Sequence, residues 1–150
     1  MSAIPAVQRA LKSAFVALYP SAASTLGSPT LTTSLDIAVV GDGTADLSKP
    51  TVGGSQRSRE EESKITCILS CYRTGDTEDA QIEANAAAWA MEKLLEEHLR
   101  TRGNETLGGV CREAWVSGYE AKDYRLEDDN GYVPGRACDI TVTVTAVTRL

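Results

Sequence analysis

Apolar side chains at the start of the chain recur at the spacing of one helical face. The stripe runs through residues 4–19, and Pro5 falls in the first turn, where its missing N–H costs nothing. Its members are Val7, Leu11, Phe15 and Leu18. We therefore predict an amphipathic helix over residues 4–19 that ends at Pro20.

Three later segments alternate apolar and polar side chains, which is typical of strands with one buried face. They are residues 31–40, 63–73 and 136–150. The buried face of the second would hold Ile65, Cys67, Leu69 and Cys71, and that of the third Cys138, Ile140, Val142, Val144 and Ala146. We expect Gly41 and Gly43 to end the first strand.

The strongest helical pattern covers residues 76–102. Asp76 or Thr77 is placed to cap its start, acidic side chains follow at the positive end of the helix dipole, and arginines lie at the negative end. Gly103 is suited to the C-cap. The apolar stripe has small side chains first and large ones later, which predicts close packing on a sheet; it consists of Ala80, Ala84, Ala87, Ala88, Met91, Leu94, Leu95 and Leu99.

A turn of Leu107, Gly108 and Gly109 follows this helix. Because glycine adopts backbone angles that side chains resist, we expect the turn to re-aim the chain from helix to sheet. Strand character continues from there to about Leu126, and Asn130-Gly131 is a strong signal for a hairpin that leads into the last strand.

Residues 41–62 are rich in glycine, serine and charged side chains, and their only apolar side chains besides proline are Ala45, Leu47 and Val52. We predict a long mobile loop that becomes ordered against a partner, because so few apolar groups do not offset the entropy of ordering. Its charged group is either a solvated face or the contact for that partner. The group consists of Arg57, Arg59, Glu60, Glu61 and Glu62.

Together these elements predict an α+β fold in a single domain over residues 1–150. We expect about four strands in a mostly antiparallel sheet, with two helices packed on one face. The long loop would lie between the first two strands.

The formal net charge of −6 argues against a general nucleic-acid binder, which normally presents a basic face to phosphates. No apolar run reaches the length of a membrane span, and Arg9 and Lys12 interrupt the N-terminal apolar pattern. We therefore expect no membrane association and a chain that stays in the cytoplasm. In a reducing compartment its cysteines would be free thiols; they are Cys67, Cys71, Cys111 and Cys138.

The sequence offers few groups for catalysis or metal binding. His98 is the single histidine, and it lacks both the second histidine of a zinc-protease helix and a Gly-x-Ser-x-Gly elbow elsewhere. Cys67 and Cys71 would lie about 13 Å apart along a strand, too far to share one ion. We expect no catalytic, cofactor-binding or metal-binding residues, and no enzymatic activity.

The order and character of these elements resemble the tail terminator proteins of long-tailed bacteriophages (siphophages), also called tail completion or minor tail proteins. The resemblance covers most of the chain. Its most specific part is Thr106-Leu107-Gly108-Gly109-Val110 after the alanine-rich helix, followed by the alternating C-terminal strand. The chain departs from the family pattern in its Gly-rich, charged 41–62 segment and its four cysteines.

The resemblance implies a virion structural protein that forms a homo-oligomeric ring, usually a hexamer, at the head-proximal end of the tail. Such a ring caps the tail tube, ends its polymerisation and joins it to the head, while DNA passes through the lumen without specific binding. Its partners would be further copies of the chain, the tail tube protein and the head-tail connector or neck protein. Candidate contacts after the turn, divided between two faces by strand alternation, are Arg112, Glu113, Trp115, Tyr119 and Lys122.

Two other functions stay open on the sequence alone. A head-tail adaptor or another tail-assembly protein would show the same absence of catalytic signatures. An enzyme of unknown type is the more distant alternative, because it requires a pocket that one histidine and no paired carboxylate motif do not indicate.

Overall fold

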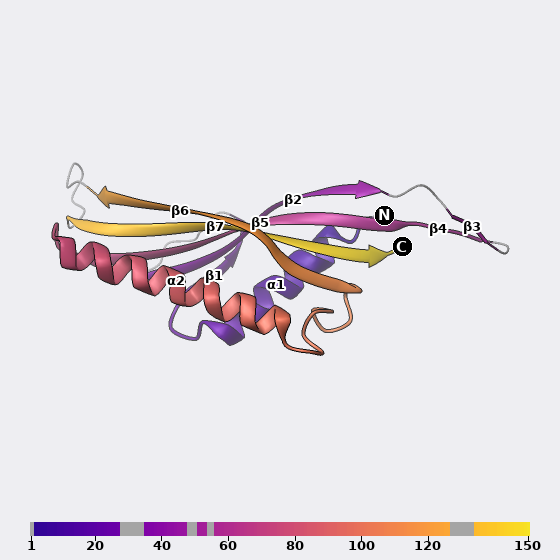
Figure 1. Ribbon diagram of the computed structural model, residues 1–150, viewed down its shortest axis with the longest axis horizontal. Helices are drawn as coiled ribbons and strands as arrows, with labels where there is room; N and C mark the ends of the chain where they lie inside the picture. The colour runs from indigo at the N-terminus through magenta and orange to yellow at the C-terminus, as the bar shows by residue number, and fades with distance from the viewer. Residues whose placement is uncertain (1, 28–34, 48–50, 54–55, 127–133) are drawn as a thin grey trace.

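The computed structural model describes residues 2–27, 35–47, 51–53, 56–126 and 134–150, with backbone only at 51–53 and 56–58. The helices are α1 (Ile4–Leu18) and α2 (Glu78–Arg100). The strands are β1 (Ala23–Leu26), β2 (Asp36–Leu47), β3 (Thr51–Gly53), β4 (Gln56–Ser58), β5 (Glu60–Thr74), β6 (Glu113–Leu126) and β7 (Gly135–Arg149). The predicted α+β class is confirmed (Figure 1).

The main sheet has five strands in the order β1-β2-β5-β7-β6, one more than predicted. Every neighbouring pair is antiparallel except β1 and β2, which run parallel, so the sheet is mixed. Strand β1 was not predicted because its four residues, Ala-Ser-Thr-Leu, carry no alternation of apolar and polar side chains. Its place in the sheet depends on pairing with Ile37–Val40, which lies elsewhere in the sequence.

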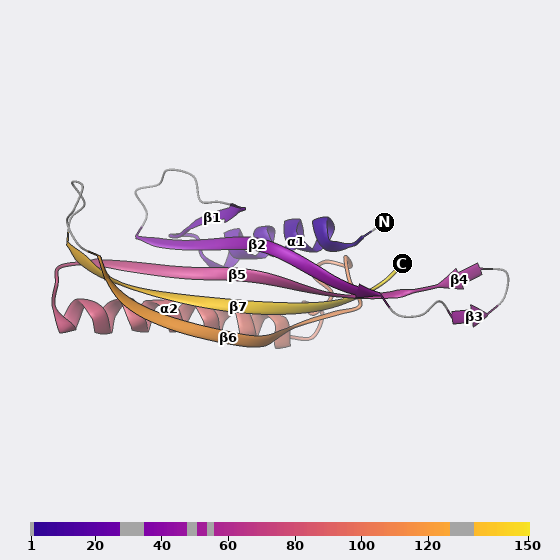
Figure 2. The same cartoon turned by 90° about the horizontal axis from the view of Figure 1, so that it is seen from above.

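Both helices lie on the same face of the main sheet, as predicted (Figures 1 and 2). Helix α1 packs on β1 and β2, and α2 packs on β5, β7 and β6. The core between the layers is formed by the predicted faces of α1, β5 and β7 and by most of the predicted stripe of α2. Within the described residues the opposite face of the sheet carries no helix, and we call it the open face.

Helix α1 confirms the predicted stripe, since Val7, Leu11 and Phe15 are fully buried. Its start is capped from a distance. Glu61 of β5 accepts hydrogen bonds through Oε1 from Ser2 Oγ and from the Ala3 backbone N–H, both at 3.0 Å. A carboxylate at this position satisfies N–H groups that a helix leaves without internal partners.

Helix α2 begins as predicted, because Thr77 Oγ1 accepts a hydrogen bond from the Ala80 N–H at 3.1 Å. Its end differs: Thr101 is the C-cap, and Gly103, with φ of 101°, lies in the following turn. One member of the predicted stripe is also wrong. Leu94 is 45% exposed, whereas the carboxyl side chain of Glu92 is buried.

The predicted loop over residues 41–62 is wrong, because most of this segment is paired strand. Strand β2 passes Gly41 and Gly43 through a bulge between Val40 and Gly43 and continues to Leu47. Glycine is needed at 41 because a Cβ there would lie 2.6 Å from the backbone oxygen of Thr66. Beyond Leu47, β3 and β4 form an antiparallel pair that leads back into β5.

The pair of β3 and β4 lies beyond the helices at one end of the molecule (Figure 2). The side-chain composition of residues 41–62 suggested a loop. The segment is a strand instead because its backbone groups are paired, with Thr44–Leu47 opposite Glu61–Lys64. Residues 48–50 and 54–55 of the predicted loop fall outside the described residues. So does the predicted Asn130-Gly131 turn, although β6 and β7 pair antiparallel as it required.

Candidate interaction surfaces

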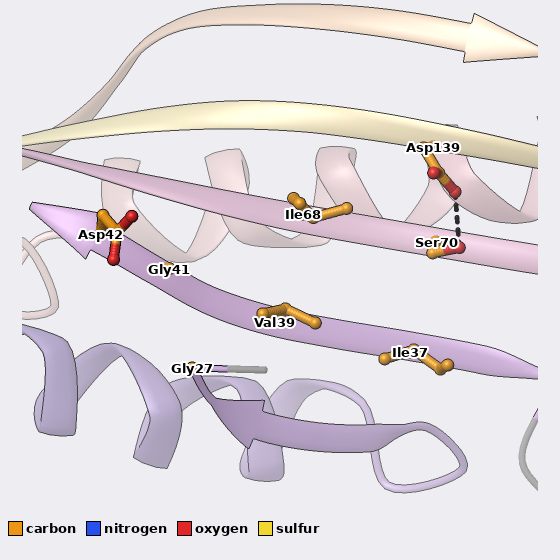
Figure 3. Close-up of a pocket in the computed structure, with 8 residues that line it drawn as sticks. All are labelled: Gly27, Ile37, Val39, Gly41, Asp42, Ile68, Ser70 and Asp139. Carbon is orange, nitrogen blue, oxygen red and sulfur yellow. Dashed lines mark hydrogen bonds between the residues drawn. The ribbon is translucent and has the colours of Figure 1, made fainter. Parts of the chain in front are cut away.

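The open face carries a groove between the end of β1 and the middle strands (Figure 3). It has a volume of about 430 Å³ and is lined by Gly27, Ile37, Val39, Gly41, Asp42, Ile68, Ser70 and Asp139. Its walls are mainly apolar. The carboxylate of Asp139 accepts hydrogen bonds from Ser70 Oγ at 2.5 Å and from the Tyr124 hydroxyl at 3.2 Å. Those two bonds hold the carboxylate in place at the rim, and the groove can receive an apolar side chain.

The buried thiols are poor nucleophiles and poor metal ligands. Burial raises the pKa of Cys67, Cys71 and Cys138 to about 12, so the reactive thiolate is scarce at neutral pH. Cys71 and Cys138 are direct cross-strand neighbours on β5 and β7, a pairing that the sequence did not reveal. All four cysteines, including Cys111, are free.

Glu92 of α2 is a buried acid that sequence reasoning missed. Its side chain is 5% exposed, and its Oε1 has no hydrogen-bond partner in the described part of the chain. Loss of hydration, and to a smaller extent the neighbouring Glu96, raises the pKa of Glu92 to about 7. Its position within the apolar stripe, between Met91 and Leu95, was the available signal.

The residues of the charged group predicted as a partner contact lie in different surroundings and do not form one surface. Glu61 is buried under the start of α1, so it is excluded as a surface contact. Glu60 forms an ion pair with Arg112 within the same chain. Glu62 and Arg59 are exposed, and the side chain of Arg57 lies outside the described part. Glu62 is therefore the acidic member most available to a partner.

The five candidate contacts after the turn lie on or beside β6, which is one edge of the sheet. Simple alternation would place Glu113, Trp115 and Tyr119 on one face. A bulge between Val116 and Gly118 changes this, because the extra residue shifts every later side chain to the other face.

Glu113 and Trp115 consequently lie on the open face, opposite Val147 and Thr145. Tyr119 lies on the helix side, where its ring meets that of Trp89 edge to face with 5.3 Å between centroids. Lys122 lies on the open face opposite Asp139. The described geometry thus places Glu113 and Trp115 side by side on the open face and Lys122 farther along the same face, while Arg112 forms an ion pair with Glu60.

The turn after α2 has the backbone angles that were predicted for its glycines. Gly108 and Gly109 have φ angles of 75° and 91°, and Leu107 also lies in the left-handed region at 50°. Leu107 is buried, which anchors the turn to the core. The chain then enters β6 after Arg112, whose N–H donates to the Val147 carbonyl at 2.8 Å.

In the described part of the chain, no cluster of three or more His, Cys, Asp or Glu side chains is placed to hold a metal ion. His98 lies near the end of α2, with Nδ1 3.4 Å from Asn104 Nδ2. None of the described helices is long and apolar enough to cross a membrane. A scan against protein-family models finds no match for the chain, and a search of curated proteins finds no related sequence.

Proposed function

We propose that this chain is a tail terminator protein of a long-tailed bacteriophage. Copies of it form a ring, six in the assembled tail, that caps the tail tube at its head-proximal end. The ring stops tube polymerisation and provides the joint to the head, and DNA passes through its lumen. The connector or neck protein contacts its other side.

The observation that carries this proposal is the large amount of sheet surface left uncovered in a chain of 150 residues. Among the residues that the structure describes, no helix covers one face of the five-stranded sheet, the 14-residue strand β6 is an edge without a further neighbour, and β3 and β4 project beyond the helices (Figures 1 and 2). Free edges and open faces invite pairing with other chains unless an assembly covers them. Gly108 and Gly109 belong to the most specific part of the resemblance to tail terminators, and both have positive φ, as expected for a turn there.

The experiment is electron microscopy of tails assembled in the presence and absence of the protein. We expect tails of uniform length that join heads when the protein is present, and tubes of uncontrolled length without heads when it is absent. Tails that reach normal length and join heads without the protein would refute the proposal. Normal length with failed head joining would instead indicate a head-tail adaptor.

A further inference from the structure

An acidic groove lies on the open face near the end that carries β3 and β4. It has a volume of about 280 Å³ and is lined by Asp46, Leu47, Glu60, Glu62 and Val147. Leu47 is the cross-strand partner of Glu61, so its side chain lies on the helix side and only its backbone borders the groove. Val147 gives the groove an apolar floor, and the carboxylates lie around that floor. This combination suits a lysine or arginine, whose aliphatic stem packs on apolar surface while the charged end meets a carboxylate.

The strand register places like charges side by side in this groove. Asp46 of β2 is the direct cross-strand partner of Glu62 of β5, and the row continues through Val147 to Glu113 of β6. Like charges directly opposite each other destabilise a sheet. None of these three carboxylates has an ion pair within the described residues, although Lys64 lies two residues from Glu62 on the same face. A cationic partner would remove this repulsion.

Helix α1 carries the complementary charge on its outer side. Arg9 and Lys12 are its only charged residues, and both are exposed with no ion pair to any described residue. With Val16, which is 54% exposed, they occupy positions i, i+3 and i+7, so they form one stripe. We call Arg9, Lys12 and Val16 the cationic stripe.

The groove and the stripe of one chain do not reach each other. The register places the groove's carboxylates on the open face, whereas α1 lies on the opposite, covered face (Figure 1). They are also two different patches. A contact between them is therefore heterologous, with each copy offering its groove to one neighbour and its stripe to the next, and such contacts give a ring when the rotation closes.

We infer, building on the proposed ring, that the cationic stripe of one copy docks in the acidic groove of the next copy. The aliphatic parts of Arg9 and Lys12 and the side chain of Val16 cover the apolar floor. Their charged ends pair with Asp46 and Glu62. This contact links neighbouring subunits, and it strengthens as ionic strength falls.

The test uses two charge-reversed variants of the full chain. Asp46→Lys/Glu62→Lys makes the groove positive, and Arg9→Glu/Lys12→Glu makes the stripe negative. All four side chains are exposed, so we expect both variants to fold with unchanged melting temperature. Glu83→Lys/Glu97→Lys, on the exposed side of α2, is the matched control with the same charge change as the groove variant.

Self-association is measured by sedimentation and native mass spectrometry over a range of concentration and salt. We expect the wild type and the α2 control to self-associate at low salt, and each reversed variant alone to associate at least about tenfold more weakly. Mixing the two reversed variants should restore association, because every groove then meets a stripe of opposite charge. The restored oligomers should contain equal numbers of the two chains.

A wild type that stays monomeric at low salt, or reversed variants that associate normally, would overturn the inference. So would a mixture that fails to recover, since that result assigns the groove to a basic partner of another kind. Each of these results is separate from the tail-length experiment. If the reversed variants associate normally and still form rings on tails, the proposed function stands and only the contact between stripe and groove is refuted.

Discussion

Replacing Glu92 by glutamine should stabilise the protein at neutral and alkaline pH but not in acid. Burial raises the pKa of this carboxyl from 4.5 to about 7, with a smaller contribution from Glu96. Below pH 4.5 the group is protonated in both the folded and the unfolded chain, so it carries no penalty. Between pH 4.5 and 7 the unfolded chain loses this proton while the folded chain keeps it, so stability falls; above pH 7 the folded chain holds a buried charge and the loss is complete.

The magnitude follows from the shift. A change of one pKa unit corresponds to about 1.4 kcal/mol, so the full penalty above pH 7 is about 3 kcal/mol. This is an upper value, because movement of the side chain toward solvent relieves part of it. Glutamine keeps the shape of the side chain without the charge, and its advantage over glutamate should therefore grow steadily between pH 4.5 and pH 7.

The assay is the free energy of unfolding by denaturant at a series of pH values. Glu97→Gln is the control, since Glu97 lies on the same helix but is exposed and pairs only loosely with Lys93 at 3.9 Å. We expect the control to follow the wild type at every pH. A difference between Glu92→Gln and wild type that does not change with pH, or a wild type that is the more stable above pH 7, would refute the burial argument.

Three further predictions concern the backbone and the thiols. Gly109→Val should lower the free energy of unfolding by on the order of 1 kcal/mol through strain alone, because φ is 91° and, apart from the adjoining residues, no described atom lies within 4 Å of the added Cβ; an unchanged melting temperature would count against the turn. Gly41→Ala should cost about 1 to 3 kcal/mol by overpacking, since the Cβ meets the rigid Thr66 carbonyl at 2.6 Å, and a neutral effect in the same assay would contradict the β2 bulge. Thiol titration should find four free cysteines in the denatured chain and slow reaction in the native one, whereas stoichiometric zinc in protein purified without chelator would overturn this.

The elements predicted correctly from the sequence are those in which apolar side chains occupy the buried positions and polar ones the exposed positions. Alternation predicted β5 and β7 correctly because one face of each packs against the helices. Thr77 could be predicted as a cap because its hydroxyl accepts from the N–H of Ala80, only three residues away. The apolar stripe of α1 was also predicted correctly, because that side of the helix packs against the sheet. In each case the signal lies within a few neighbouring residues.

The remaining features depend on contacts between distant segments. Strand β1 forms because it pairs in parallel with β2. Strands β3 and β4 pair through backbone hydrogen bonds, which amino-acid composition does not predict. Glu61 looked like a surface charge until the start of α1 was placed over it. The β6 bulge likewise separated Trp115 from Tyr119, so the division of candidate contacts between faces required the register of the whole strand.

The number of copies of this chain at the end of a finished tail decides whether it forms the proposed ring. Cryo-electron microscopy of intact tails, with the density at the head-proximal end compared with the fold described above, provides that count. We expect a closed ring of six copies around an open lumen. A single copy at the tail end, or density at that end that the five-stranded sheet and its two helices do not fit, would contradict it.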